Sequence, residues 1–172
     1  NGDIANLRGV DSAYIFVNPI DKNIFYGSYP SFKYSNEVLL ENKLDNRLAI
    51  PVGESSDFAS LMMPKSGTGI ISKEEDIFNK REIFVSGVFP GNDQLDNTVI
   101  SPIELTRELL DLPKKSAYTI VIKLKNPDLT DTVKNQLQEK LGTKYLVTTK
   151  AEENAAFWIM INTEKLFIYL IF

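Results

Sequence analysis

The C-terminal end of the chain constrains the fold most strongly. Residues Ala155–Phe172 are apolar except for a band of four polar residues, and the last seven, Leu166–Phe172, form an unbroken apolar run. A helix that crosses a bilayer needs about 20 predominantly apolar residues. The run therefore predicts the beginning of a truncated transmembrane helix, with residues 151–172 as the stalk that leads into it. A buried core helix or an edge strand at the C-terminus fits the same pattern.

The residues around this apolar run also suit a membrane interface. A tryptophan and a lysine come before the run, and both residue types are common where a helix enters the headgroup region. The sequence therefore predicts an interface that includes these two residues and the start of the run. The predicted membrane-interface residues are Trp158, Lys165, Leu166 and Phe167.

Composition is that of a globular chain and excludes several classes of function. The 172 residues are 43% hydrophobic and 24% charged, which suits one domain with two lobes. The net charge of -4 argues against a nucleic-acid surface, which needs clustered basic residues. The chain has no Cys and no His, which excludes disulfides, thiolate or imidazole metal sites and Ser-His-Asp chemistry. We therefore expect no catalytic residue, no cofactor and no metal.

Residues 1–100 are predicted to form a β-rich lobe. Short β-prone runs such as Tyr14–Val17 alternate there with turn residues and are expected to be strands. Glu37–Leu48 is expected to be a short helix, because three leucines recur in it at a spacing of four residues. Pro51 and Gly53 follow directly and are expected to end that helix.

Two further β-prone runs, Phe58–Met63 and Ile83–Phe89, predict a hairpin in this lobe. The polar loop between them, Pro64–Glu82, is long for a hairpin connection. It carries apolar residues among charges, as a docking surface does, and the same residues would also fit a loop folded back onto the lobe. The predicted partner-binding residues are Pro64, Ile70, Ile71, Ile77 and Phe78.

Three short patterns in the loops contain residues of a binding or catalytic site, but each lacks the full motif of such a site. Ser66–Gly69 (SGTG) has the glycines of a phosphate cradle without the rest of the pattern, and is expected to be a flexible tip. Asp93 and Asp96 offer oxygen ligands outside the EF-hand register. The adjacent carboxylates of Glu74–Asp76 lie on a polar loop, where we expect them to be solvated.

Residues 101–150 are predicted to form a helix followed by a βαβ lobe. A short strand at Val99 and Ile100 leads into a helix, for which Ser101 is the expected N-cap and Pro102 the first helical residue. Pro113 is expected to end this helix.

The βαβ pattern follows. Thr119–Lys125 is expected to be a strand, Asp128 to cap the next helix, and Tyr145–Thr149 to return as a strand, with Gly142 making the turn at the end of the helix. The chain is therefore expected to be an α+β protein. It would have a β-rich lobe and a βαβ (half ferredoxin-like) lobe that ends in a stalk helix entering the membrane.

Five segments, spread over nearly the whole chain, carry a family resemblance. They are Gly9–Asp11 (GVD), Glu37–Glu54, Val85–Phe89 (VSGVF), Val99–Leu112 and Glu153–Phe172. Taken in order, they resemble the extracytoplasmic domain of lipoprotein-releasing ABC transporter permeases of the LolC/LolE type. These are FtsX-like permeases that share a MacB-type periplasmic core. In the last segment, the residues matching the family pattern before its second membrane helix are Asn154, Phe157, Glu164 and Lys165.

The resemblance implies a location and a set of partners. Such a domain lies outside the inner membrane, in the periplasm, between the first two membrane helices of a four-helix permease. It implies a second permease subunit and a cytoplasmic ATPase subunit that binds ATP. A protruding loop in one permease subunit of this family recruits a periplasmic lipoprotein carrier. The Pro64–Glu82 loop occupies the corresponding place, although its sequence does not match residue by residue.

The sequence departs from the family in two ways. Glu41 and Asn42 stand where the family has a glycine at the start of its small helix. The family domain also begins with a βαβ half after its first membrane helix, and the resemblance implies that this chain starts after that half. The βαβ unit at Thr119–Thr149 would then have an uncovered sheet edge or face, unless the N-terminus aligns differently with the family.

The leading hypothesis is thus a non-enzymatic periplasmic domain of a lipoprotein-releasing permease. A MacB-type efflux permease domain that contacts an adaptor protein is the second hypothesis. A membrane-tethered sensor or division regulator is the third.

Overall fold

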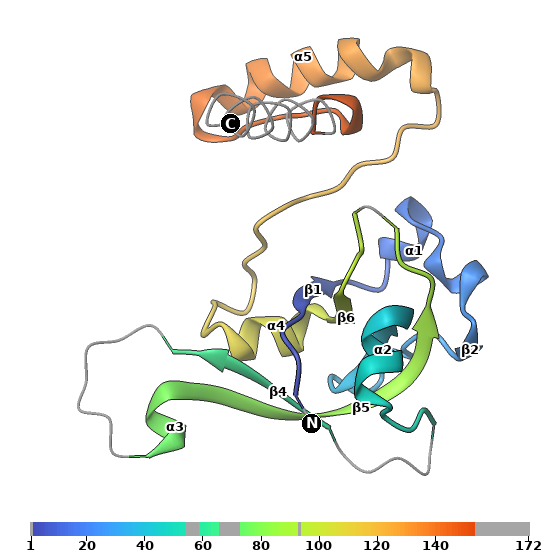
Figure 1. Cartoon of the computed structure of the whole chain (residues 1–172). Coiled ribbons are helices and arrows are strands. Elements are labelled where there is room, and N and C mark those ends of the chain that lie inside the picture. The colour runs from blue at the N-terminus through green and yellow to red at the C-terminus, as the bar shows by residue number, and fades with distance from the viewer. Residues whose placement is uncertain (1, 54–58, 66–72, 93, 154–172) are drawn as a thin grey trace, which may run out of the picture. The chain divides into compact units, whose positions relative to one another are not determined.

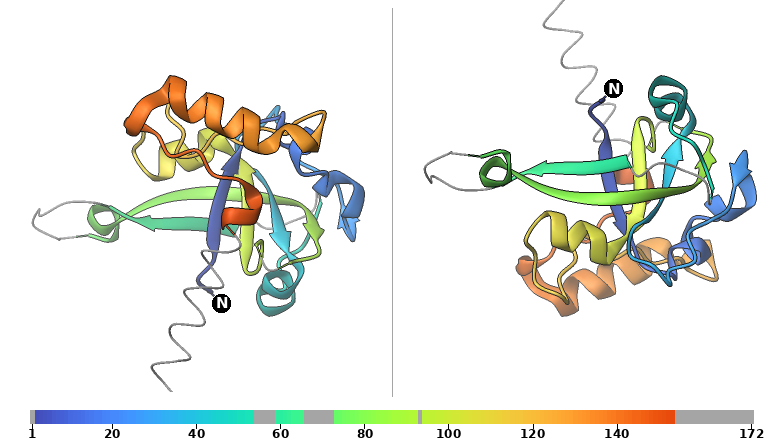
Figure 2. Two further views of the ribbon diagram at one scale, coloured as in Figure 1. Left: turned by 90° about the horizontal axis from the view of Figure 1, so that it is seen from above. Right: turned by 90° about the horizontal axis from the view of Figure 1, so that it is seen from below.

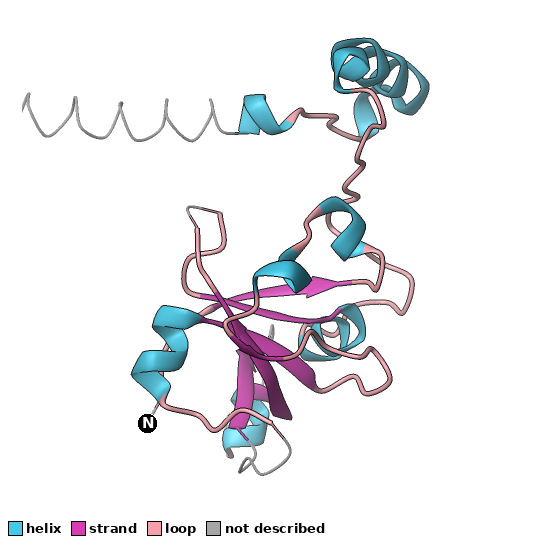
Figure 3. Cartoon of the chain, turned by 90° about the vertical axis from the view of Figure 1, so that its right-hand side faces the viewer, coloured by secondary structure: helices cyan, strands magenta, loops and turns pink. Residues whose placement is uncertain are grey.

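The computed structural model describes residues 2–53, 59–65, 73–92 and 94–153 (Figure 1). The chain folds as two units, Asn1–Val121 and Ile122–Phe172, which are described separately below. The first unit holds all the strands found in the described ranges, and the second contains helices and loops (Figure 3). The division falls after α4 (Ile103–Leu109), since this helix packs against a strand of the first unit.

The first unit is built on a mixed sheet, which confirms the α+β class. Its strands are ordered β1-β6-β3-β5-β2, with β4 also paired to β5. The β1–β6 and β3–β5 pairs are parallel, while β6–β3, β5–β2 and β4–β5 are antiparallel. The bounds are β1 Asn6–Val10, β2 Tyr26–Gly27, β3 Glu37–Glu41, β4 Ala59–Pro64, β5 Phe78–Phe89 and β6 Thr98–Pro102.

Both faces of the sheet are covered by packed side chains, so the residues of its central strands are buried on either side. Leu39 and Leu40 are adjacent in β3 and point to opposite faces, and each belongs to a different hydrophobic cluster. The Leu40 cluster includes residues of α2 (Asn42–Leu48) and α4. The Leu39 cluster includes Ile20 from a 3-10 turn at Ile20–Asn23. Burial on both faces explains why β3 and β6 lack the alternating pattern of a half-exposed strand.

The helix predicted over Glu37–Leu48 is wrong in its first half. That half is strand β3, and the helix α2 starts only at Asn42. Glu41 marks the change: its carboxylate accepts hydrogen bonds from the backbone N–H groups of Lys43 (3.0 Å) and Leu44 (3.3 Å), which caps the helix. Of the leucines spaced by four, only the last two lie in a helix. Leu40 is buried in the sheet instead.

The step from β6 into α4 is confirmed, but the predicted N-cap is wrong. Ser101 is the fourth residue of β6, and Pro102 occupies the N-cap position without a side-chain hydrogen bond. Ser101 Oγ lies 2.9 Å from Thr106 Oγ1, which ties the buried strand to the first turns of the helix. A Cβ atom on Gly9 would come within 2.3 Å of Thr106 Oγ1, so only glycine fits where α4 crosses β1.

The strand predicted at Tyr14–Val17 is also wrong. These residues form the short helix α1, which leaves Phe16 exposed and Tyr14 packed at the edge of the Leu39 cluster. Four residues give two alternations at most, too few to distinguish a strand from one helical turn. The structure therefore uses this segment as a cover for one face of the sheet.

The second unit contains α5 (Thr130–Leu141) between 3-10 turns at Pro127–Leu129 and Gly142–Lys144. Asp128 does not cap α5, whose N-cap residue is Leu129 and makes no side-chain hydrogen bond. Asn126 caps the preceding 3-10 turn, since its side-chain oxygen accepts the backbone N–H of Asp128 at 3.0 Å. Gly142 ends the helix as predicted, with a φ of 66°.

The predicted βαβ unit does not form. Neither Thr119–Lys125 nor Tyr145–Thr149 is a strand in the structure. A strand is defined by its ladder, and no ladder within the described residues includes either segment. Gln138 holds the second segment by side-chain hydrogen bonds instead, accepting from the Val147 N–H and donating to the Tyr145 carbonyl, both at 2.9 Å.

The predicted stalk and membrane helix fall on residues that the structure describes only up to Glu153. The four predicted interface residues, Trp158, Lys165, Leu166 and Phe167, lie outside the described ranges. Among the residues that are described, no helix has the length and apolar character needed to cross a bilayer.

Candidate functional site: the β4–β5 hairpin arm

The predicted hairpin is confirmed, but the predicted loop Pro64–Glu82 is too long, because β4 extends to Pro64 and β5 begins at Phe78, not at Ile83. β4 pairs antiparallel with the first half of β5, in a register that runs from Ala59 opposite Ile83 to Pro64 opposite Phe78. Beyond the last pair, Lys65 N–H donates to the Ile77 carbonyl at 2.7 Å. We call residues 59–65 and 73–83 the hairpin arm. Figures 1 and 2 show it extending from the sheet beyond the other strands, with α3 (Glu74–Ile77) near its far end.

The arm has an inner and an outer face, because directly opposed residues of an antiparallel pair share a face. On the inner face, Ala59, Leu61 and Met63 are partly buried and pack against the Leu40 cluster. The burial of β4 alternates strictly along its length, so Met62 and Pro64 are exposed on the outer face. The inner face thus fixes the arm to the core and leaves the outer face free for contacts.

Two polar side chains of β5 attach the arm to the end of α4. Asn79 Nδ2 donates to the Leu109 carbonyl at 2.9 Å and to Asp111 Oδ2 at 2.8 Å. Arg81 Nε donates to Glu108 Oε2 at 3.1 Å. The Arg81–Glu108 pair is about half exposed and contributes little stability. The first of the Asn79 bonds instead satisfies the Leu109 carbonyl in the last turn of α4, where carbonyl groups have no partner within the helix.

The structure brings together three of the five predicted partner-binding residues. Pro64 and Phe78 are directly opposed on the outer face, and Ile77 (36% exposed) precedes Phe78. Ile70 and Ile71 lie outside the described residues. One apolar residue of this face was missed: Met62, which is 48% exposed. Its position two residues before Pro64 in a β-prone run would have placed it on the same face.

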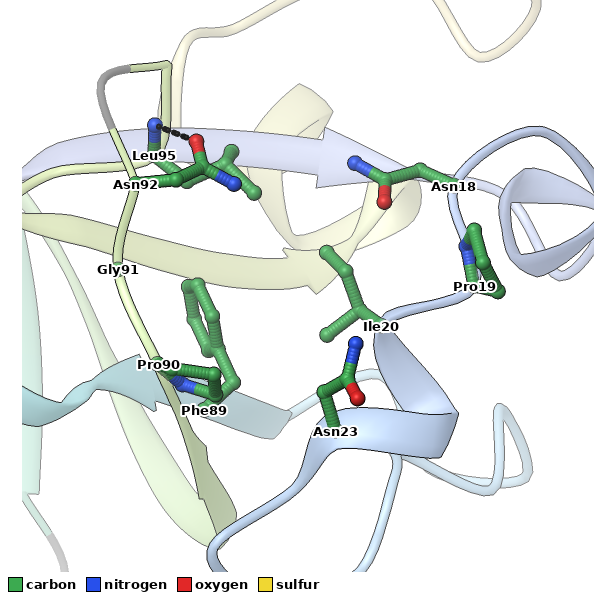
Figure 4. Close-up of a pocket in the computed structure, with 9 residues that line it drawn as sticks. All are labelled: Asn18, Pro19, Ile20, Asn23, Phe89, Pro90, Gly91, Asn92 and Leu95. Atoms are coloured by element: carbon green, nitrogen blue, oxygen red, sulfur yellow. Dashed lines mark hydrogen bonds between the residues drawn. The ribbon is translucent and has the colours of Figure 1, made fainter.

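A small pocket lies between the Ile20–Asn23 turn and the loop that follows β5 (Figure 4). Its floor is apolar, formed by the buried side chains of Ile20, Phe89 and Leu95. Asparagine side chains surround this floor, and the amide of Asn92 faces inward with its Oδ1 accepting the Leu95 N–H at 3.1 Å. The volume of about 170 Å³ is below the roughly 300 Å³ of ordinary ligand sites. None of the nine lining residues is ionisable, so the pocket offers no general acid or base.

A buried carboxylate lies beside β2, on α2. Asp45 is 5% exposed and accepts a hydrogen bond at Oδ2 from the Tyr26 hydroxyl, while its Oδ1 has no hydrogen-bond partner in the structure. This hydrogen bond, followed by burial, raises the pKa of Tyr26 to about 12. Among the described residues, no group of acidic side chains that could hold a metal ion includes Asp45. The hydrogen bond between Tyr26 and Asp45 joins β2 to α2.

The acidic loop residues that the structure describes do not gather into a metal site. Asp96 pairs with Lys43 (Nζ–Oδ1 2.6 Å) at a site where both side chains are more than half exposed. Asp93 and the Ser66–Gly69 tip lie outside the described residues. Glu74–Asp76 belong to the short helix α3 instead of a loop. Among the described residues, no group of three or more acidic side chains could hold a metal ion.

No family model matches this chain, and no curated protein sequence matches it.

Proposed function

We propose that this chain is a non-enzymatic docking domain of an ABC transporter permease, located on the periplasmic side of the inner membrane. Its activity would be to bring a periplasmic carrier to lipoproteins that the permease releases. ATP hydrolysis would belong to a separate cytoplasmic subunit, and a second permease subunit would complete the membrane part. The five segments of family resemblance and the hairpin arm support this proposal.

The outer face of the hairpin arm is the observation that carries the proposal. It presents the exposed residues Met62 and Pro64 and the partly buried Phe78 on one side of a two-stranded ribbon, next to Ile77. The inner face and Asn79 hold the same ribbon against the core and α4. Apolar side chains displayed on a supported element are suited to binding, because the element loses little conformational freedom when a partner docks.

Charges on the outer face add specificity to this apolar contact. Lys80 and Glu82 follow Phe78 at alternate positions of β5, so they share its face, and both are exposed. A carrier that presents an apolar rim with polar neighbours would be complementary to this arrangement. Apolar anchors near the centre of an interface give most of its affinity, and rim charges mainly affect the association rate.

Binding of the purified lipoprotein carrier from the same organism tests the proposal. Replacing Met62 with Ser should weaken binding by about tenfold, the equivalent of roughly 1.4 kcal/mol. The melting temperature should change little, because Met62 is about half exposed on the face turned away from the core. Replacing Ile70 and Ile71 with Ser should weaken binding in the same way if the tip of the loop also docks.

Phe16→Ser is the matched control, since Phe16 is an exposed aromatic residue outside the arm. It should leave carrier affinity unchanged. Equal losses from Phe16→Ser and from the arm variant would contradict the proposal. So would a large fall in melting temperature with affinity intact, which would assign the arm residues to packing. Binding of an efflux adaptor in place of the carrier would favour the MacB-type alternative.

A further inference from the structure

The segment from Tyr118 to Lys125 has the sequence of a strand but no strand partner. Four of its apolar side chains are strongly exposed: Tyr118 82%, Ile120 83%, Val121 55% and Ile122 59%. The segment crosses the boundary between the two units without regular secondary structure (Figure 1). Such a set of exposed β-branched and aromatic residues is unusual at the surface of a monomer and typical of a contact.

The backbone of this segment is open as well. Within the described ranges, Thr119–Lys125 makes no backbone hydrogen bond to another segment. Unpaired N–H and C=O groups in a β-prone, apolar run are a template for strand addition. The occupant that satisfies them best is therefore another extended polypeptide.

The sequence of the segment is complementary to itself. In an antiparallel pair of two copies with the two-fold axis at Val121, Ile120 lies opposite Ile122 and Tyr118 opposite Leu124. Thr119 lies opposite Lys123 on the other face. One face of the strand pair then carries only apolar side chains from both copies, which form cross-strand pairs. They are Tyr118, Ile120, Ile122 and Leu124.

Charge selects this register over its neighbour. If the axis moves by one residue, to Ile122, the apolar side chains still share one face. The Lys123 side chain of one copy then lies diagonally across from the Lys123 side chain of the other. Like charges at such positions repel. The axis at Val121 separates these lysines by four positions along the strands, and places an uncharged Thr119 opposite each.

We propose that two copies of this chain associate through Thr119–Lys125, as an antiparallel strand pair centred on Val121. The inference does not depend on the proposed docking function. Two short strands bury less surface than a standard stable interface. The dimer is therefore expected to be a weak one whose population rises with protein concentration, as light scattering over a dilution series would measure.

Cysteine cross-linking tests the register, because the chain has no cysteine of its own. In Val121→Cys, the two thiols lie opposite each other across the axis, with Cα atoms about 5 Å apart, within the range of a disulfide. In Tyr118→Cys, the two thiols lie roughly 20 Å apart, six residues at about 3.3 Å each. Both sites are exposed, so neither substitution should affect folding.

Mild oxidation of the full chain should therefore cross-link Val121→Cys into a dimer and leave Tyr118→Cys monomeric. Mixing Tyr118→Cys with Leu124→Cys should give the mixed disulfide that neither forms alone. Equal cross-linking of Val121→Cys and Tyr118→Cys would overturn the proposal, since association would then not involve this register. Preferential cross-linking of Ile122→Cys, or a monomer at every concentration, would also overturn it.

Discussion

Glu41 provides the sharpest test of how this sequence forms its core. It lies at the junction of β3 and α2, is 1% exposed, and accepts the backbone N–H groups of Lys43 and Leu44 through its carboxylate. Replacing it with Ala removes both acceptors. The N–H of Leu44 is buried, so water cannot replace the lost bond without rearrangement of the junction.

The expected cost follows from these contacts. Loss of a side-chain N-cap costs about 1 kcal/mol. A buried N–H left without a partner costs about 1–3 kcal/mol. Glu41→Ala should therefore lower the free energy of unfolding by at least about 2 kcal/mol. Glu41→Gln should lower it less, because the amide keeps one acceptor oxygen and nearly the same volume.

Urea unfolding followed by far-ultraviolet circular dichroism measures this change. With a slope of about 1.5 kcal/mol per M, the midpoint of Glu41→Ala should fall by roughly 1.5 M. Glu82→Ala is the matched control, because Glu82 is exposed on β5 and its loss should change stability by no more than about 0.5 kcal/mol. Equal midpoints for the two variants would refute the role of Glu41 and, with it, the strand-to-helix change at this residue.

Two further predictions concern a buried phenol and the C-terminal run. Burial raises the pKa of Tyr29 to about 12, and its hydroxyl has no hydrogen-bond partner in the structure. The neutral form is thus favoured on folding, so this contribution to stability is complete below pH 10 and is lost as the pH rises towards 12. Tyr29→Phe should remove one phenol that titrates late in an absorbance titration. Urea unfolding at pH 7 should show the variant to be more stable by about 1 kcal/mol, because the unpaired hydroxyl is gone. A destabilised variant would mean that the hydroxyl has a partner. Deleting Leu166–Phe172 should reduce association in light scattering, because an apolar run exposed to water promotes self-association, and an unchanged mass would count against the membrane prediction.

Local patterns were sufficient where a segment's own residues determine its structure. The β-prone runs at Phe58–Met63 and Ile83–Phe89 predicted the hairpin. The short strand before Ser101 predicted the β6–α4 step, and Gly142 predicted the end of α5. The hairpin depends on side chains that alternate along two neighbouring strands, and the other two features depend on residues at the end of a helix. Residues far along the chain therefore add little information about them.

Distant neighbours determine the segments that the sequence did not predict correctly. Val38–Leu40 became strand because β5 and β6 lie on its two sides, and the leucine spacing that indicated a helix gives no information about those neighbours. Thr119–Lys125 has strong β-propensity but belongs to no ladder within the described residues, because a strand also needs a hydrogen-bonded partner. For the arm, strand alternation would have added Met62 to the predicted outer face, whereas the attachment of Asn79 to α4 follows only from the folded structure.

Site-specific photocross-linking from the outer face of the arm shows whether the arm docks a carrier. A photoreactive phenylalanine would replace Phe78 in one strain and Phe16 in another, with the whole protein produced in its own cells. We expect an adduct with the periplasmic lipoprotein carrier, identified by its antibody, from position 78 and not from position 16. Carrier adducts that are equal at the two positions, or absent from position 78, would contradict the assignment of the hairpin arm as the docking element.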